Sequence, residues 1–533
     1  MAVKRYGVQY CACEWAYSSG QVYADPFNEI ELDVLFAGPQ GQEWVVPAYW
    51  AGDQEWRVRF APPAAGTYTY RTVCSDPGNP DLHGQQGILV VKPYAGSNKL
   101  LQHGPLRVSE MHTHLEHLDG TPFLWLADMW WFGMCKRLTW PEEFQRLAAD
   151  RVAKGFSAIQ IVAGFSCDTP PYDERGENEA GHPWEADYAR INPAYFDMAD
   201  LRLQWLVHEE LLPCLLGCWG FYLPWMGVQK VKQHWRYLIA RYGAYPVIWC
   251  LAGCGTMPYY LSQNKEEDRL AQKRGWTEVA RYVREVDPYH HPVTMHPTDS
   301  ARDQVEDDAL IDVDMLQAGH MGLLGVPRTL DRIRAAIARS PRKPVVSGEN
   351  AFEGRFDSSH QEVQRLMFWT YMLSGAVGFT YCAEGLWQVN KVEQPFGPSP
   401  GGVASSDITW WEAAQQPGSR QLGIGKRLLE RYGFGRLESH PEWIEPHASG
   451  EDFTKPHAAG IPGQLRIFYF PRPASNWGPP VIAKELEAEA QYRAFYFDPR
   501  NGQEHPLGTV SGPEWRVPFA PRLHDWVLVL ERV

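Results

Sequence analysis

The stretch Pro344-Val345-Val346-Ser347-Gly348-Glu349-Asn350 combines a short apolar run with an acidic end. A β-branched run of this length, bounded by proline and glycine, predicts a fully buried strand. In a barrel of parallel strands, the residue just past the carboxyl end of a strand points into the pocket where such folds carry out their chemistry. Glu349 is therefore a candidate catalytic carboxylate, although it could instead cap the next helix or pair with Arg355.

The composition of the chain sets broad limits on its class. Its 533 residues exceed what one hydrophobic core usually holds, so two or three domains are expected. The formal net charge of −14 argues against nucleic acid or an anionic membrane as the main partner. Aromatic residues make up 13% of the chain and include 23 Trp, which is enough for a core and for surfaces that stack against a ring-shaped ligand.

Three features predict a cytoplasmic location. Residues 1–10 are too polar for a signal peptide, no apolar run approaches the length of a membrane span, and ten cysteines without a secretion signal are best explained as reduced thiols. Cys214 and Cys218 are four residues apart, as are Cys250 and Cys254. Residues four apart on one strand are separated by about 13 Å, so these four thiols cannot bind one ion. We expect no metal and no cofactor, and a homo-oligomer is possible.

Between residues 98 and 435, short apolar runs alternate with segments of helical periodicity. The runs predicted as strands are 122–128, 157–163, 213–217, 247–251, 292–296, 313–317, 344–349 and 377–381. Most are followed by a helical pattern, such as 142–154, which begins after Pro141. Eight strands in one continuous run with intervening helices predict a (β/α)8 TIM barrel.

The segments on either side of the barrel show the alternation of β-strands. Runs 30–36, 56–60, 67–72 and 88–91, separated by turn residues, predict an Ig-like β-sandwich over residues 1–97. Its aromatic residues Trp44, Tyr49 and Trp50 could form its core or a platform for sugar, and we favour the core. Runs 464–470, 493–497 and 526–530 predict a C-terminal β-sandwich over residues 436–533. The predicted fold class is multidomain, a central TIM barrel flanked by two all-β domains.

The strand ends of the predicted barrel bring aromatic, acidic, amide and imidazole side chains to one rim. The candidate substrate-binding residues are Asp128, Trp130, Trp131, Trp219, Tyr222, His296, Gln317, His320, Tyr381, Glu384 and Trp387. The loop 164–190 after the second strand is long and polar, and we expect it to form a wall or lid of the pocket. Sugars stack their C–H faces on aromatic rings and hydrogen-bond through their hydroxyls, so this rim predicts a carbohydrate pocket.

Several stretches resemble bacterial apiosidase-like glycoside hydrolases, and the resemblance covers essentially the whole chain. The matching stretches are 44–60, 122–128, 219–225, Gln317-Ala318-Gly319-His320 and Ser347-Gly348-Glu349-Asn350. The resemblance implies an Ig-like domain, a TIM barrel, a C-terminal β-domain and a carbohydrate substrate. Such enzymes look like members of the large retaining clan whose catalytic carboxylates follow strands four and seven. By that resemblance, Glu349 is the catalytic nucleophile.

The chain departs from that clan at the end of the fourth strand. The clan has a Glu there as acid/base, and alignment of the strand end places Cys254 at this position. A thiol with a pKa of about 8.5 is too weak an acid to help a reluctant leaving group. Three interpretations are open. The acid/base was substituted; or the protein uses Cys254 itself or borrows Glu384 or Asp168; or it is a carbohydrate-binding protein that has lost catalysis.

Overall fold

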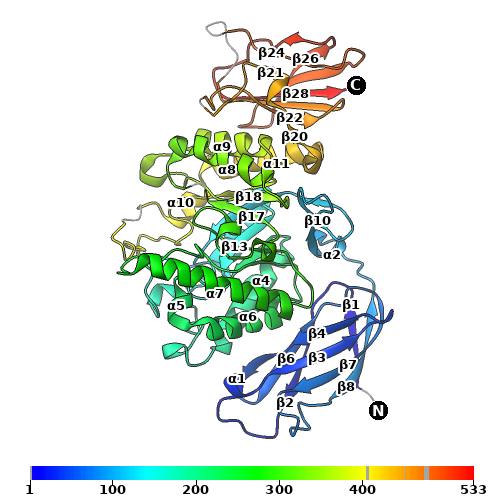
Figure 1. Ribbon diagram of the computed structural model, residues 1–533, viewed down its shortest axis with the longest axis vertical. Coiled ribbons are helices and arrows are strands. Elements are labelled where there is room, and N and C mark those ends of the chain that lie inside the picture. The colour runs from blue at the N-terminus through cyan, green and yellow to red at the C-terminus, as the bar shows by residue number, and fades with distance from the viewer. Residues whose placement is uncertain (1–2, 318, 404–406, 451, 473–478) are drawn as a thin grey trace.

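The structure is a computed structural model that describes residues 3–317, 319–403, 407–450, 452–472 and 479–533. Ala318, which belongs to one of the stretches quoted above, lies outside the described residues. Figure 1 shows three parts along the long axis of the molecule, with a β-rich part at each end and the barrel between them. The predicted fold class is confirmed, whereas the exact domain limits 1–97, 98–435 and 436–533 stay predictions.

Eight parallel strands form the barrel sheet in the order β16-β15-β14-β13-β12-β19-β18-β17. They are β12 (Trp125–Trp130), β13 (Ala158–Val162), β14 (Leu212–Leu216), β15 (Ile248–Cys250), β16 (Val293–Thr294), β17 (Asp314–Gln317), β18 (Val345–Glu349) and β19 (Gly378–Tyr381). The two outer strands of this order also meet, because the N–H groups of Asp312 and Val313 donate to the Val293 carbonyl at 2.8 and 3.2 Å. The sheet therefore closes into a barrel.

The first barrel strand begins later than the sequence predicts. Pro122–Phe123 forms a separate short strand, β11, which pairs antiparallel with β10 (Leu115–His117). β10 also pairs with β9 (Leu106–Val108), so these three strands make a small sheet of their own. The barrel strand β12 starts at Trp125 and pairs in parallel with β13 and β19.

Helices cover the outside of the barrel. The main ones are α3 (Glu142–Lys154), α4 (Pro193–His208), α6 (Val228–Tyr242), α7 (Lys265–Val286), α8 (Val326–Ala338), α9 (Gln361–Leu373) and α11 (Pro417–Arg431). In α8, Val326, Leu330 and Ile333 are buried, at the spacing of three to four that gives a helix one apolar face. None of the described helices is long and apolar enough to cross a membrane.

The N-terminal part consists of two packed sheets. One has the order β1 (Val3–Val8), β8 (Gln86–Lys92), β7 (Gly66–Cys74), β3 (Leu32–Ala37) and β4 (Glu43–Pro47), and the other β2 (Cys13–Ser18), β6 (Glu55–Phe60) and β5 (Tyr49–Gly52). Phe36 and Phe60 join the two sheets by stacking with ring centroids 4.0 Å apart. Tyr49 and Trp50 are buried, as the core interpretation requires, and Trp44 packs against the same core. The Ig-like nature of this sandwich stays a prediction.

A buried charge cluster joins the N-terminal sandwich to the barrel. Arg59 of β6 donates to Asp200 of α4, and Arg241 of α6 donates to the other oxygen of the same carboxylate at 2.8 Å. Burial would raise the pKa of Asp200, but the charges of Arg241 and Arg59 outweigh it and lower the pKa. The sandwich is thus fixed to the barrel by an ionised carboxylate between two guanidinium groups.

The C-terminal part also contains two sheets. Their orders are β20 (Glu438–Ser439), β22 (His457–Ile461), β23 (Leu465–Phe470), β28 (Trp526–Arg532), β25 (Tyr492–Phe497) and β26 (Glu504–Val510), and β21 (Ile444–Glu445), β24 (Ile482–Ala483) and β27 (Trp515–Arg516). Arg365 of α9 donates to both carboxylate oxygens of Asp525, at 2.8 and 2.6 Å. This part therefore docks on the helices that surround the barrel.

Candidate active site

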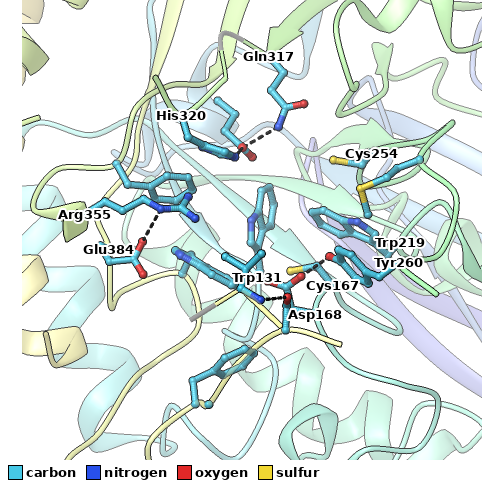
Figure 2. Close-up of a pocket in the computed structure, with 18 residues that line it drawn as sticks. Trp131, Cys167, Asp168, Trp219, Cys254, Tyr260, Gln317, His320, Arg355 and Glu384 are labelled. Carbon is cyan, nitrogen blue, oxygen red and sulfur yellow. Dashed lines mark hydrogen bonds and ion pairs between the residues drawn. The ribbon is translucent and has the colours of Figure 1, made fainter. Parts of the chain in front are cut away.

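A cavity of about 260 Å³ opens at the carboxyl ends of the barrel strands (Figure 2). Its walls are formed by Trp131, Cys167, Asp168, Trp219, Cys254, Met257, Tyr260, Gln317, His320, Glu349, Phe352, Arg355, Glu384, Trp387, Phe396, Gly397, Ser399 and Val403. All of these residues belong to the barrel segment, so both flanking β-rich parts lie outside the pocket wall. The predicted rim and the observed cavity are at the same end of the barrel.

Glu349 is a nearly enclosed carboxylate of this pocket, with only 4% of its surface exposed. Gln317 Nε2 donates to its Oε1 at 2.7 Å, His320 Nε2 lies 3.1 Å from Oε1, and His296 Nε2 lies 3.0 Å from Oε2. Burial alone would raise the pKa of this carboxyl, but the His320 charge, His296 and the Gln317 amide together lower it to about 2. Glu349 is therefore an ionised, buried carboxylate, and it does not form the alternative ion pair with Arg355.

The residues beside Glu349 explain why its strand ends in this motif. A Cβ atom at Gly348 would lie 2.1 Å from Met315 Cγ, so only glycine fits between β18 and the neighbouring strand β17. Ser347 donates to Asn350 Oδ1 at 2.7 Å, and Asn350 Nδ2 donates to the Thr380 carbonyl at 2.9 Å. These contacts tie the strand end to β19 and hold Glu349 in place.

Aromatic rings form much of the wall around Glu349. Trp131 and Trp219 meet edge to face with ring centroids 5.4 Å apart, and Trp387 packs against Phe396 at 5.5 Å. Phe352 lies 5.0 Å from the His320 ring. Such rings offer apolar faces to the C–H groups of a sugar, while the adjacent polar groups can take its hydroxyls.

Cys254 lies in the pocket wall in an unusual backbone conformation. Its φ of 43° is left-handed, a region that non-glycine residues seldom adopt. Its Sγ is 3.8 Å from His296 Nδ1 and 3.9 Å from the Pro297 carbonyl. Burial, then the charges of Glu349 and Asp168, raise the pKa of this thiol well above its ordinary value. Cys254 therefore stays protonated and is an even weaker acid than an exposed cysteine.

Asp168 reaches the pocket from the loop after β13. Its φ of 53° is also left-handed, and the Tyr260 hydroxyl donates to its Oδ1. Burial raises the pKa of this carboxyl, and the Glu349 charge raises it further, against the hydrogen bond from Tyr260. This loop forms a pocket wall, as its length predicted, and it carries a carboxyl with a raised pKa.

A third carboxylate of the pocket, Glu384, lies beside a cation. Arg355 Nε is 3.9 Å from its Oε2, and Gln388 Nε2 is 3.3 Å from its Oε1. Figure 2 shows this pair on a different side of the pocket from Tyr260 and Asp168. Arg355 thus faces Glu384 rather than the strand-seven carboxylate.

The structure brings together many, but not all, of the predicted site residues. Those that line the cavity are Trp131, Trp219, Cys254, Gln317, His320, Glu349, Glu384 and Trp387. The predicted residues outside its lining are Asp128, Trp130, Tyr222, His296 and Tyr381. His296 nevertheless contacts Glu349 directly, from behind the wall.

Asp128 and Trp130 are turned away from the cavity. Asp128 Oδ2 accepts from Arg151 Nε of α3 at 2.5 Å and from Trp130 Nε1 at 3.0 Å, and its Oδ1 accepts from the Met129 N–H at 2.9 Å. Both Asp128 and Arg151 are fully buried. Because these donors occupy the carboxylate, we no longer assign Asp128 or Trp130 to sugar binding.

The two tyrosines also serve packing roles. Tyr381 Oη donates to Glu353 at 2.6 Å, and the Arg151 guanidinium lies 5.6 Å from its ring centre. Tyr222 stacks on Phe165 with ring centroids 4.9 Å apart, behind the pocket wall. Their burial explains why a position at a strand end did not bring them into the cavity.

Sequence reasoning missed several wall residues. They are Cys167, Met257, Tyr260, Phe352, Arg355 as a wall residue, Phe396, Gly397, Ser399 and Val403. Met257 belongs to the predicted end of strand four but was not chosen as a site residue, and Tyr260, Phe352 and Arg355 lie only a few residues beyond the predicted strand ends. The stretch 396–403 is distant from the end of β19, and no pattern in the sequence indicated its position.

Comparison with known families agrees with this geometry. The family described as "Apiosidase-like, catalytic domain" matches residues 109–435, more than half of the chain. The chain belongs to the apiosidase-like family. The resemblance seen in the sequence is thereby confirmed, and this apiosidase-like protein is a glycoside hydrolase. A domain of unknown function, DUF5060, matches residues 3–75, within the N-terminal sandwich.

Solved structures show the same fold. A putative glycoside hydrolase from Bacteroides vulgatus ATCC 8482 is 16% identical with a TM-score of 0.69, over 99% of this chain and 100% of that one. A glycoside hydrolase family 5 structure from the same organism is 18% identical with a TM-score of 0.65, over 81% and 93%. A third structure, described as a glycoside hydrolase, is 20% identical with a TM-score of 0.66, over 80% and 97%. No curated protein matches the apiosidase-like chain.

Proposed function

We propose that the protein is a retaining glycoside hydrolase in which Glu349 is the nucleophile. The observation that carries this proposal is the ionised Glu349 carboxylate at the end of β18, held by His296, His320 and Gln317 inside an aromatic pocket. A carboxylate with a low pKa is available to attack the anomeric carbon at every ordinary pH. Fixed donors around it keep its attacking oxygen in one orientation.

The substrate of this reaction is a carbohydrate glycoside. The family name directs attention to glycosides of apiose, a branched pentose, which we propose as the first substrates to test. The small cavity with its aromatic wall suits a single sugar unit at the point of cleavage. Acidic, amide and imidazole groups at the strand ends supply hydrogen-bond partners for its hydroxyls.

One observation favours a second function. Retaining enzymes need a group that protonates the leaving oxygen, and the position expected for it carries the weakly acidic Cys254. If nothing else supplies that proton, the protein binds carbohydrate at this pocket without cleaving it. The two functions share the fold and the pocket, and they differ in whether glycosides with poor leaving groups are cleaved.

A mechanism-based probe, followed by hydrolysis assays, separates these two functions. The protein would be incubated with epoxide and 2-fluoroglycosyl fluoride probes of apiose and of the common pentoses and hexoses, followed by intact-mass measurement and peptide mapping. We expect a covalent adduct on Glu349. Glu362→Gln is the matched control, because Glu362 is an exposed glutamate in the first turn of α9. Because fluoride leaves without a proton, the adduct identifies the nucleophile, and hydrolysis of phenyl and natural glycosides identifies the hydrolase. Sugar binding without turnover of these glycosides would support the silent binding protein instead.

A further inference from the structure

We propose that Asp168 is the proton donor of this reaction and that Tyr260 positions it. This inference rests on the proposed retaining mechanism, and it assigns the one role that the mechanism leaves empty. Glycoside cleavage needs an acid on the leaving-group side of the bond, opposite the nucleophile. Cys254 occupies the expected position, and its buried thiol does not release a proton readily.

Asp168 lies across the pocket from the groups that hold Glu349. Figure 2 shows Gln317 and His320, both of which contact Glu349, on one side of the pocket, and Asp168 with Tyr260 on another side. A sugar held in the cavity would therefore have the nucleophile on one side and the Asp168 carboxyl on the other. Two carboxyl groups that flank one bond are the arrangement used by most glycosidases.

Asp168 is held in place by its backbone conformation and by Tyr260. Its left-handed backbone, φ 53°, is a conformation that tends to persist at functional sites, where the surrounding structure enforces it. Tyr260, which follows strand four, donates its hydroxyl proton to Oδ1 across 92 residues of sequence. This bond fixes the carboxyl plane and leaves Oδ2 as the oxygen that holds and transfers a proton. Tyr260 is thus a positioning residue.

The carboxyls of Glu349 and Asp168 lie in different environments. Glu349 is surrounded by imidazole and amide donors, whereas Asp168 is half-buried with the Glu349 charge acting on it. When two carboxyls of one site lie in environments that push their pKa values apart, the one with the higher pKa suits the acid and the one with the lower pKa suits the nucleophile. The other titratable groups that act on Asp168 or on its neighbours are Tyr260, Arg355, Arg175, Cys167 and Cys254.

In the proposed reaction, Asp168 gives one proton in the first step and recovers one in the second. A Glu349 oxygen attacks the anomeric carbon while the bond from that carbon to the leaving oxygen breaks, and the proton of Asp168 moves to the leaving oxygen. An ester of Glu349 and an alcohol result, and Asp168 is left as a carboxylate. Asp168 then takes a proton from water as the water oxygen attacks the anomeric carbon. The ester bond breaks, the Glu349 carboxylate is released, and both groups return to their starting state.

Glu384 fits this role less well. Its two oxygens lie next to the Arg355 guanidinium and the Gln388 amide, which are donors to a carboxylate. A carboxylate held in this way accepts hydrogen bonds, and we assign it to the sugar hydroxyls rather than to proton transfer. The three pocket carboxyls therefore have three roles.

The test compares leaving groups. Asp168→Asn removes the acid and keeps a side chain that tolerates left-handed backbone. The matched control is Asp187→Asn, an exposed aspartate of the same loop that also has a left-handed φ of 57°. On glycosides that share one sugar, we expect Asp168→Asn to slow release of phenol by about 10² to 10⁴-fold and release of 2,4-dinitrophenol far less in the glycosylation step. Asp187→Asn should change neither rate appreciably.

Two further readouts distinguish acid/base catalysis from a structural role. Sodium azide should raise turnover of Asp168→Asn on the dinitrophenyl substrate and yield a glycosyl azide, since azide needs no base. Tyr260→Phe removes a hydrogen bond that lowers the pKa of Asp168, so the alkaline limb of kcat/KM should move to higher pH. In Asp168→Asn that limb should be absent.

The outcomes separate this inference from the function on which it rests. If the wild-type protein hydrolyses none of the glycosides and forms no adduct on Glu349, the retaining mechanism is wrong and the proton donor with it. Suppose instead that the wild type is active. If the folded Asp168→Asn variant then releases phenol and 2,4-dinitrophenol with equally reduced rates, or keeps full activity, only the role of Asp168 is wrong. Leaving-group dependence that appears in Cys254→Ala instead would assign the proton to the thiol.

Discussion

His296 Nε2 lies 3.0 Å from Glu349 Oε2, and Nδ1 of the same ring lies 3.8 Å from Cys254 Sγ. One buried imidazole therefore connects the strand-seven carboxylate with the strand-four position. The imidazole acts with His320 and Gln317 to keep Glu349 ionised although the carboxylate is almost fully buried. A carboxylate in this state can attack carbon but cannot supply a proton, which is why the acid must be sought elsewhere in the pocket.

Glu349→Gln should lower kcat by about 10⁴-fold or more, because the amide that replaces the carboxylate cannot form the glycosyl ester. The change keeps the size and shape of the side chain, so sugar binding and the folded state should persist. Initial rates, titration calorimetry with a ligand and thermal unfolding measure these three properties. Full turnover in the variant would show that Glu349 is not the nucleophile, and Glu362→Gln should behave like the wild type.

Asp128→Ala should destabilise the protein without weakening ligand binding by the folded fraction. The change removes one of the two carboxylates that lie 2.5 Å from the fully buried Arg151 guanidinium, the other being Asp150. Breaking a buried pair completely costs about 3 to 5 kcal/mol, which is the upper bound for this loss. Denaturant unfolding would give the loss of stability, and calorimetry at a temperature where the variant is folded would give the affinity. Unchanged stability combined with lost affinity would show that Asp128 binds the ligand after all. Asp187→Ala is a surface control.

The fate of Asp128 shows what the sequence could and could not predict. The apolar run before it predicted that the first strand ends at Asp128, but β12 continues to Trp130, so Asp128 lies within the strand. The barrel itself followed from eight such runs. Successive side chains on a strand point to opposite faces, so a position at a strand end leaves the face undecided. Asp128 and Tyr381 both contact Arg151 of α3 on the outer face, whereas Thr380 lies inside the barrel.

The pairing of Asp168 with Tyr260 was also beyond the sequence. Both residues lie in irregular segments, after β13 and after β15, and 92 positions separate them. Periodicity locates strands and helices, but it does not say which two loop side chains will meet. The position of Glu349, in contrast, could be predicted from the sequence. Its strand is a short β-branched run that begins after a proline, and Glu349 ends that strand at the edge where the pocket lies.

Stability near pH 4 should depend on Asp200, which lies between Arg59 and Arg241. Its pKa is lowered by folding, so its contribution is fully present above the pKa of about 3.9 that it has in the unfolded chain, and is lost as pH falls through the lower folded value. Asp200→Asn should therefore be less stable than the wild type at pH 6, and the difference should shrink below pH 4. Thermal unfolding at several pH values measures it. A difference that stays constant down to pH 2 would contradict the assignment, and Asp197→Asn tests the exposed neighbour of the same cluster.

A carboxyl at the strand-four position should replace the missing acid when Asp168 is removed. The double variant Asp168→Asn/Cys254→Glu places a longer acidic side chain at the pocket wall, where the resemblance to the retaining clan expects a glutamate. We expect it to recover at least about 10-fold of the phenyl-glycoside activity that Asp168→Asn loses, since general acid catalysis contributes about 10² to 10⁴-fold in all. The recovery on dinitrophenyl glycosides should be smaller, because that leaving group departs without a proton.

Cys254→Gln in the same background is the control, for it matches the new side chain in size but carries no acid. Equal recovery by glutamine and glutamate would trace the effect to shape, and a stable double variant without recovery would show that the strand-four position no longer reaches the leaving oxygen in this pocket.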